Sequence, residues 1–202
     1  MSIHLNRIYT KFGDAGQTAI PGGTIVDKDS IICDTMGDID ELNCHIGILH
    51  TYFVNDYRHV IENANVIGKL KDCFTMIQND LFDIGCNVSM VYADNPPLID
   101  ASHITVLEEN LDTLNAMLPT LNSFVLPGGG GEIASHSHLA RAVCRRVERK
   151  LVTCKKQFLI RPDALKYINS LSDFLFVYAR WALRKEKGEE FLWETPLKRA
   201  TA

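Results

Sequence analysis

Apolar residues recur every three or four positions in five separate segments of the chain, a spacing typical of amphipathic helices. The segments run over about 34–53, 65–88, 102–118, 134–154 and 162–188. Prolines or glycines separate the later ones, at Pro96 and Pro97, at Pro119 and at 128–131. No strand pattern is convincing. The sequence therefore predicts an all-α five-helix bundle, a single domain over 1–202 with a helical bundle at 34–188 and a long N-terminal loop at 1–30.

The N-terminal loop combines glycines, hydroxyl groups and a lysine, most densely between Thr10 and Thr18. Glycines permit unusual backbone dihedral angles, so the backbone amides of such a loop could wrap phosphate oxygens. No Gly-Lys-Ser/Thr motif follows it, which excludes a Walker A loop. Two interpretations remain open: a flexible surface loop, or a loop that a ligand orders.

Composition and charge exclude several classes of function. The formal net charge of −4 over 202 residues provides no global attraction for nucleic acid or an anionic membrane. No segment approaches the ~20 consecutive apolar residues of a membrane span, and the start of the chain does not read as a signal peptide. The six cysteines are scattered without a Cys-x-x-Cys pair, which favours free thiols. We therefore expect a soluble, cytoplasmic protein whose cysteines and histidines bind no metal.

The fourth segment divides into an apolar side and a basic side. On a helical wheel one side carries Leu139, Val143, Val147 and Leu151, and the opposite side carries His138, Arg141, Arg145 and Arg149. The simplest interpretation is a solvated outer face. However, arginines four residues apart repel one another unless an anion lies across them, and guanidinium groups suit bidentate contacts with phosphate or carboxylate. An anion-binding face is the alternative.

Polar lines also follow the first and fifth segments. In the first, Asp40 lies opposite the apolar side among small residues, so it is either a solvated acid or the partner of an arginine across a subunit contact. In the fifth, the line comprises Lys166, Asn169, Asp173, Arg180 and Arg184. Three helices with such lines favour a site or an interface.

Several motifs together resemble one family, the PduO-type ATP:cob(I)alamin adenosyltransferases. They are IYTK (8–11), GD (13–14), GQT (16–18), GDIDELN (37–43), IQNDLFDIG (77–85), FVLPGG (124–129), HLARAVCRRVER (138–149), YIN (167–169) and LSD (171–173). Their order and their spread over most of the chain make the resemblance specific.

The resemblance implies a five-helix bundle that assembles as a homotrimer with active sites between subunits. The N-terminal ATP contacts would be Thr10, Lys11, Gly13, Thr18 and Lys28, and those from the helices Arg145, Glu148, Arg149 and Asn169. It further implies that Asp40 pairs with Arg141 across the subunit contact. Phe124 matches the aromatic residue at the lower face of the corrin.

The implied reaction transfers the 5′-deoxyadenosyl group of ATP to the cobalt of reduced cobalamin and releases triphosphate, with Mg²⁺ bound through the ATP phosphates. The electrons would come from an unidentified reductase. Two departures from the family pattern are Ala15, where a lysine is common, and Ser170, where an arginine is usual. They motivate an alternative: a non-catalytic bundle of the same fold that binds corrinoid or nucleotide for storage, delivery or sensing.

Overall fold

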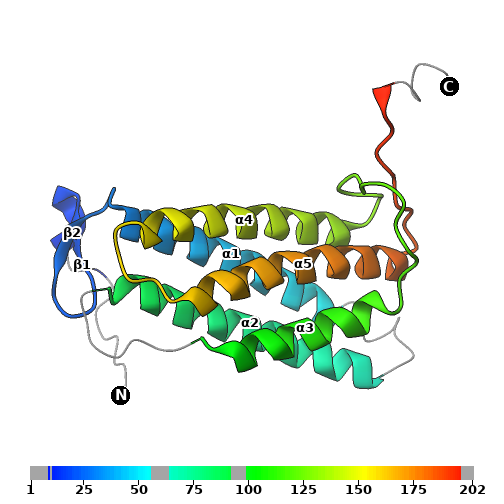
Figure 1. Ribbon diagram of the computed structural model, residues 1–202, viewed down its shortest axis with the longest axis horizontal. Coiled ribbons are helices and arrows are strands. Elements are labelled where there is room, and N and C mark those ends of the chain that lie inside the picture. Colours follow the sequence, from blue (N-terminus) through cyan, green and yellow to red (C-terminus); the bar gives the residue numbers. More distant parts are fainter. Residues whose placement is uncertain (1–8, 10, 56–63, 92–98, 197–202) are drawn as a thin grey trace.

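The computed structural model is a bundle of five helices and describes residues 9, 11–55, 64–91 and 99–196 (Figure 1). The helices are α1 (Ile31–Asn55), α2 (Ala64–Ser89), α3 (Ala101–Asn115), α4 (Glu132–Lys155) and α5 (Pro162–Lys185). The predicted five-helix fold is confirmed. None of the helices in the described part is both long and apolar enough to cross a membrane.

The helix ends follow local sequence signals. Asp100 caps α3, since its carboxylate accepts a hydrogen bond of 2.8 Å from the backbone N–H of Ser102. Hydrogen bonds from Ser102 and His103 hold the pKa of the Asp100 carboxyl well below its usual range. Pro162 occupies the first turn of α5, where its missing N–H group costs nothing. The structure ends α3 at Asn115, somewhat before the predicted end.

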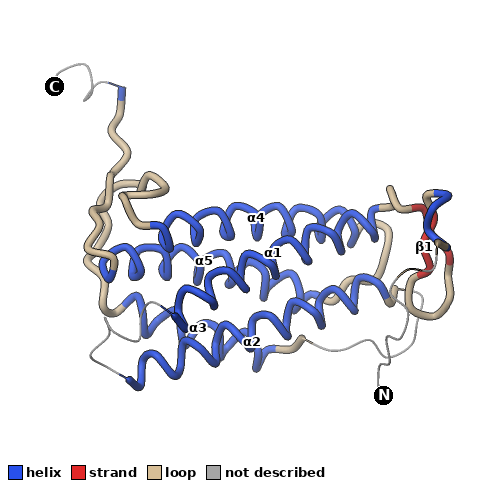
Figure 2. Tube along the Cα trace, turned by 180° about the vertical axis from the view of Figure 1, so that it is seen from behind, coloured by secondary structure: helices blue, strands red, loops and turns tan. Residues whose placement is uncertain are grey.

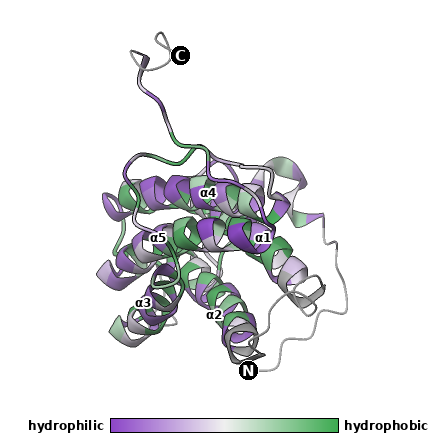
Figure 3. Cartoon of the chain, turned by 90° about the vertical axis from the view of Figure 1, so that its right-hand side faces the viewer, coloured by the Kyte–Doolittle hydropathy of each residue, from purple (hydrophilic) through white to green (hydrophobic). Residues whose placement is uncertain are grey.

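The core is centred on α5, which is buried along most of its length. It packs against α4 and α3, while α1 packs against α2 and α4 (Figures 1 and 3). An aromatic cluster fills the middle of the bundle: the Phe74 ring on α2 meets Tyr178 edge-on at 4.9 Å between centroids, and Phe174 stacks on Tyr178. Aromatic pairs in this geometry add stability beyond their buried area.

Two predictions about α4, for the neighbouring residues His138 and Leu139, were wrong. Leu139, predicted on the apolar side, is 47% exposed, and His138, predicted on the basic side, is only 5% exposed. The buried face of α4 is broader than one wheel stripe because the helix packs against both α1 and α5. Val143, Val147 and Leu151 are buried as predicted.

The N-terminal region contains a short β-hairpin that the sequence did not predict. Strands β1 (Gln17–Ala19) and β2 (Ile25–Asp27) pair antiparallel, with Thr18 opposite Val26 (Figure 2). Three-residue strands are too short to show an alternating pattern. Gly22 and Gly23 make the turn with φ of 90° and 83°, angles that favour glycine.

The chain continues beyond α5 as an extended segment that lies along the loop between α3 and α4. Val125 forms an antiparallel bridge with Leu192, and the Trp193 N–H donates to the Phe124 carbonyl at 2.7 Å. This contact lies at one end of the bundle, whereas the β-hairpin lies at the other (Figures 1 and 2).

Candidate functional site

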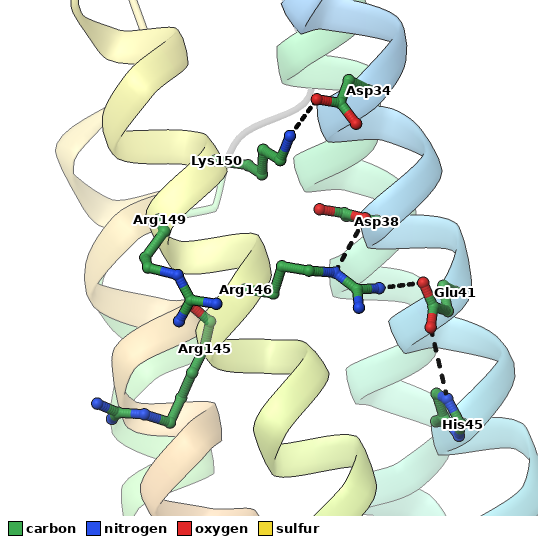
Figure 4. A network of polar contacts seen from close by, with 8 residues as sticks. All are labelled: Asp34, Asp38, Glu41, His45, Arg145, Arg146, Arg149 and Lys150. Carbon is green, nitrogen blue, oxygen red and sulfur yellow. Dashed lines mark hydrogen bonds and ion pairs between the residues drawn. The ribbon is translucent and has the colours of Figure 1, made fainter.

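Basic side chains on α4 are of two kinds, and the first kind faces α1. Arg146 donates to Asp38 at 3.1 Å and also pairs with Glu41 (Figure 4). One turn later, Lys150 pairs with Asp34. Because partly exposed pairs contribute little stability, their clearest effect is to fix the orientation of α4 against α1.

The second kind, Arg145 and Arg149, points away from α1 (Figure 4). Neither is in an ion pair within the described residues, and Arg149 donates to the backbone carbonyl of Arg145 at 2.9 Å. Both are exposed. Two like charges at this spacing repel each other by a few tenths of a kcal/mol. A multivalent anion across them would remove that repulsion.

Glu148 and Arg145 lie near Cys144, at the contact between α4 and the turn of α5 that precedes Asn169. The Cys144 thiol donates to the carbonyl of Ile168 at 3.2 Å, which holds that turn of α5 against α4. Burial raises the pKa of the Cys144 thiol, with a further contribution from the Glu148 carboxylate and an opposing one from Arg145. Asn169 follows Ile168 and is exposed beside this turn.

Ser170, one of the two departures from the family pattern, faces a different direction. Its hydroxyl donates to the Glu108 carboxylate on α3 at 2.8 Å, and the residue is nearly buried. This side chain therefore stabilises the α3–α5 contact.

Arg141 lies one turn before Arg145 and is half-buried. Its guanidinium carbon is 6.0 Å from the centroid of the Phe176 ring, within the range of a cation–π contact. Burial lowers the pKa of Arg141, and the neighbouring charge of Arg145 lowers it further. Its Nε atom is buried without a hydrogen-bond partner among the described residues. Such a donor is costly unless another molecule supplies an acceptor.

The N-terminal hairpin brings together two of the predicted nucleotide contacts. The Lys28 ammonium packs over Gly13 so closely that a β-carbon on Gly13 would lie 2.7 Å from Nζ. The backbone N–H of Lys28 also donates to the Gly16 carbonyl at 2.9 Å. Lys11 has a left-handed backbone, with φ of 62°. Thr18 lies in β1, and Thr10 lies outside the described residues.

Phe124 is 79% exposed at the opposite end of the bundle. Its ring meets Trp193 edge-on, with 6.4 Å between centroids and an interplanar angle of 69°. Both rings line a cavity of about 850 Å³ together with Phe176 and Leu192. The sequence analysis missed Trp193, although the apolar run Phe191-Leu192-Trp193 in a polar tail was a usable signal.

Asp40 is exposed on α1 and lines a groove of about 480 Å³ between α1 and α2. The groove is largely apolar and includes Phe82, which is 67% exposed. Asp40 forms no ion pair with Arg141 within the described chain. The two residues belong to different helix pairs, Asp40 to α1–α2 and Arg141 to α4–α5.

Within one chain, the predicted site residues therefore lie in separate regions. The hairpin lies at one end of the bundle, and the α3–α4 loop, which contains Phe124, lies at the other (Figure 1). Arg145, Glu148, Arg149 and Asn169 occupy the α4–α5 face between them. Within the described residues, no group of three or more His, Cys, Asp or Glu side chains could hold a metal.

Comparison with known proteins gives consistent matches over nearly the whole chain. A family model described as cobalamin adenosyltransferase matches residues 8–182. The chain is 37% identical to a cobalamin adenosyltransferase of Cupriavidus metallidurans, covering 96% of this chain and 97% of that protein. It is 38% identical to a corrinoid adenosyltransferase of Mycobacterium leprae, covering 96% and 98%.

Solved structures agree with these matches. A variant PduO-type ATP:corrinoid adenosyltransferase from Lactobacillus reuteri, complexed with cobalamin and ATP, superposes with a TM-score of 0.81 at 32% identity. The match covers 94% of this chain and 97% of that one. A second variant from the same organism, complexed with ATP, has a TM-score of 0.78 at 34% identity, with coverage of 93% and 100%.

Proposed function

Because this chain belongs to the cobalamin adenosyltransferase family, we propose that it transfers the 5′-deoxyadenosyl group of ATP to the cobalt of cob(I)alamin. The products are adenosylcobalamin and triphosphate. The observation that carries the proposal is the pairing pattern on α4. Arg146 and Lys150 pair with carboxylates on α1, whereas Arg145 and Arg149 have no acidic partner in the described part of the chain. Those two cations are available to a polyphosphate.

ATP binds between the α4–α5 face and the hairpin of a neighbouring subunit. Arg145 and Arg149 contact phosphate oxygens through charge-assisted hydrogen bonds. Glu148 and Asn169 contact the nucleotide from the same face. From the hairpin, Lys28 and Gly13 approach the phosphates with Thr10, Lys11 and Thr18. The close packing of the Lys28 ammonium over Gly13 in one chain supports the grouping of these two residues.

Assembly as a homotrimer brings the separated regions together. Asp40 pairs with Arg141 of the next subunit, so the α1–α2 groove of one chain faces the α4–α5 face of another. Two observations support this contact: the exposed Phe82 beside Asp40, and the buried, unpartnered Nε of Arg141. An acceptor from a second subunit would satisfy that donor.

Phe124 binds the lower face of the corrin ring. Its exposed ring beside a cavity of about 850 Å³ supports this role. An apolar side chain at this face excludes water and the lower ligand from cobalt. Without that ligand, Co(II) is reduced more readily to the nucleophilic Co(I) state.

In the transfer step, the electron pair of Co(I) attacks the 5′ carbon of the ATP ribose. A Co–C bond forms, the C5′–O bond breaks, and the triphosphate leaves with the electron pair of that bond, while cobalt becomes formally Co(III). The substrate is the nucleophile, so the protein contributes position and charge. Arg145 and Arg149 stabilise the negative charge that develops on the leaving group.

Mg²⁺ fits this site through the ATP phosphates, because it commonly binds phosphate oxygens with only one or two protein carboxylates. The ion would supply charge compensation for triphosphate. A separate reductase supplies the electron for Co(I), and the protein acts in the cytoplasm.

The direct test is an anaerobic absorbance assay with ATP, Mg²⁺, cobalamin and a chemical reductant. We expect Co(I) to convert to a light-sensitive alkylcobalamin with release of one triphosphate per product. A variant with Phe124→Ala should bind ATP but form product slowly. Binding of both ligands with no product would instead support the storage or sensing alternative. The relevant departure would then be Ala15, which is exposed at the end of the short 3-10 helix Phe12–Ala15.

A further inference from the structure

A single buried guanidinium ties together the two segments that surround Phe124. Arg180, on α5, is 4% exposed. Its Nε donates to Glu190 at 2.7 Å, and its Nη2 donates to the Pro119 carbonyl at 2.9 Å. Pro119 lies in the loop that carries Phe124, and Glu190 lies in the segment after α5 that carries Trp193. One side chain therefore contacts both segments.

Backbone hydrogen bonds continue this connection up to the aromatic pair. Leu126 N–H donates to the Phe191 carbonyl at 2.7 Å, and Trp193 N–H donates to the Phe124 carbonyl at the same distance. The hydroxyl of Ser123 also donates to the Trp193 carbonyl at 2.9 Å. The position of the Phe124 ring therefore depends on the register between these two segments.

We propose that Arg180 is a positioning residue for Phe124. By holding Pro119 and Glu190 on one guanidinium, it sets the register of the two segments and thereby the position of the Phe124 ring relative to the corrin. It does not contact the substrates. The inference rests on the proposed function, since it assigns a role within that site.

The shape of the guanidinium explains why an arginine stands here. Its N–H donors diverge in a rigid plane, so Nε can donate to the Glu190 carboxylate while Nη2 donates to a backbone carbonyl. A lysine ammonium is a single point donor on a flexible chain. It could retain the charge pair with Glu190 but would not fix Pro119 at the same time.

The test compares Arg180→Met with Lys187→Met in the full-length protein. Lys187 lies just after the end of α5 and is exposed, so it controls for the loss of a cation from the same end of the bundle. We expect Arg180→Met to lower kcat on the order of tenfold to a hundredfold, the scale of an ångström-sized misplacement. The KM for ATP should stay within about twofold. Lys187→Met should match the wild type.

Spectra of bound Co(II) cobalamin provide a readout that a purely structural role would not change. With ATP present, absorbance and EPR spectra report whether a ligand occupies the lower face of cobalt. Arg180→Met should restore the lower ligand signal, as should Phe124→Ala. Arg180→Lys should give a mixed spectrum, because the lysine restores only the pair with Glu190.

Removing one partner of a buried pair can unfold the protein, so a second variant is needed. In Arg180→Met/Glu190→Met both charges are absent, and such apolar replacements are often tolerated. We expect this variant to recover thermal stability but not the wild-type Co(II) spectrum. A wild-type spectrum and kcat in the folded double variant would overturn the positioning role. Failure of the wild-type protein to form adenosylcobalamin would instead refute the proposed function.

Discussion

The carboxylate of Glu186, just after the end of α5, accepts hydrogen bonds from the backbone N–H groups at the start of α4. The Ile133 N–H donates at 3.0 Å and the Ala134 N–H at 3.2 Å. The N-cap position of α4 is Gly131, which has no side chain to provide this cap. A distant glutamate therefore supplies both the missing acceptor and a negative charge at the positive end of the helix.

We predict that Glu186→Ala lowers the free energy of unfolding by about 1–2 kcal/mol, the usual effect of losing an N-cap. Urea unfolding at neutral pH followed by circular dichroism measures this change. Glu189→Ala is the control, since Glu189 is exposed nearby and its side chain caps no helix. Equal stability of both variants would contradict the capping role.

The glycine run before α4 offers a comparison of backbone strain with steric clash. Gly129 and Gly130 have similar φ values of 79° and 82°. A β-carbon on Gly129 would lie 2.3 Å from the Glu189 carbonyl, whereas one on Gly130 meets nothing within 4 Å. Gly130→Ala should therefore cost about 1–2 kcal/mol from strain alone. Gly129→Ala should cost clearly more, and equal losses in urea unfolding would show that the close approach is absent.

Arg145→Ala should weaken ATP binding by about 2 kcal/mol, or roughly thirtyfold, because charge-assisted contacts with phosphate are lost. Arg146→Ala is the matched control on the same turn. Arg146 pairs with Asp38 and Glu41, so its removal should change ATP affinity only slightly. Isothermal titration calorimetry with ATP, in the absence of reduced cobalamin, measures the ATP affinity of both variants. Similar losses would argue against separate roles for the two arginines.

Single substitutions at the proposed subunit contact should weaken assembly. Asp40→Arg and Arg141→Asp each place like charges opposite one another, so we expect smaller species by analytical ultracentrifugation. The double variant carries the exchanged pair and should recover much of the trimer. A double variant no better than the single ones would reject the Asp40–Arg141 pairing.

His138 predicts a specific pH dependence of stability. The pKa of His138 is lowered to about 4, mainly by burial and also by the Arg141 charge, with Glu190 partly opposing both. Since the unfolded histidine titrates near 6.5, the unfolded state binds more protons between these values. Stability should fall as pH decreases from about 6.5 to about 4, by at most about 3 kcal/mol from this residue. His138→Gln should show a shallower decrease in urea unfolding across that range.

The sequence alone predicted the helices well because their apolar periodicity is local. It also identified Arg145 and Arg149 as cations on one line, and both are exposed together. Arg146 was not on that line, and its pairing with Asp38 and Glu41 could not be predicted because these carboxylates of α1 are distant in the chain. Arg180, on the polar line of the fifth segment, is buried, and its charge is compensated by Glu190, which lies outside every predicted element.

The loop around Phe124 was the least predictable part. Its geometry depends on the pairing of Val125 with Leu192, and a bridge between such distant residues has no periodic signal. The apolar run that ends at Trp193 was visible in the sequence, but only the structure relates it to Phe124. The hairpin was missed because its strands have three residues each.

The dependence of the Phe124 loop on residues 190–193 has a consequence for synthesis of the chain. A ribosome completes the loop and all five helices before the segment that aligns the loop is made. A nascent chain stopped just after α5 would already contain every helix of the core, yet its Phe124 would lack the backbone partner at Trp193. Late nonsense mutations just after α5 should therefore yield catalytically poor protein of reduced stability, because they also remove Glu190, the partner of the buried Arg180.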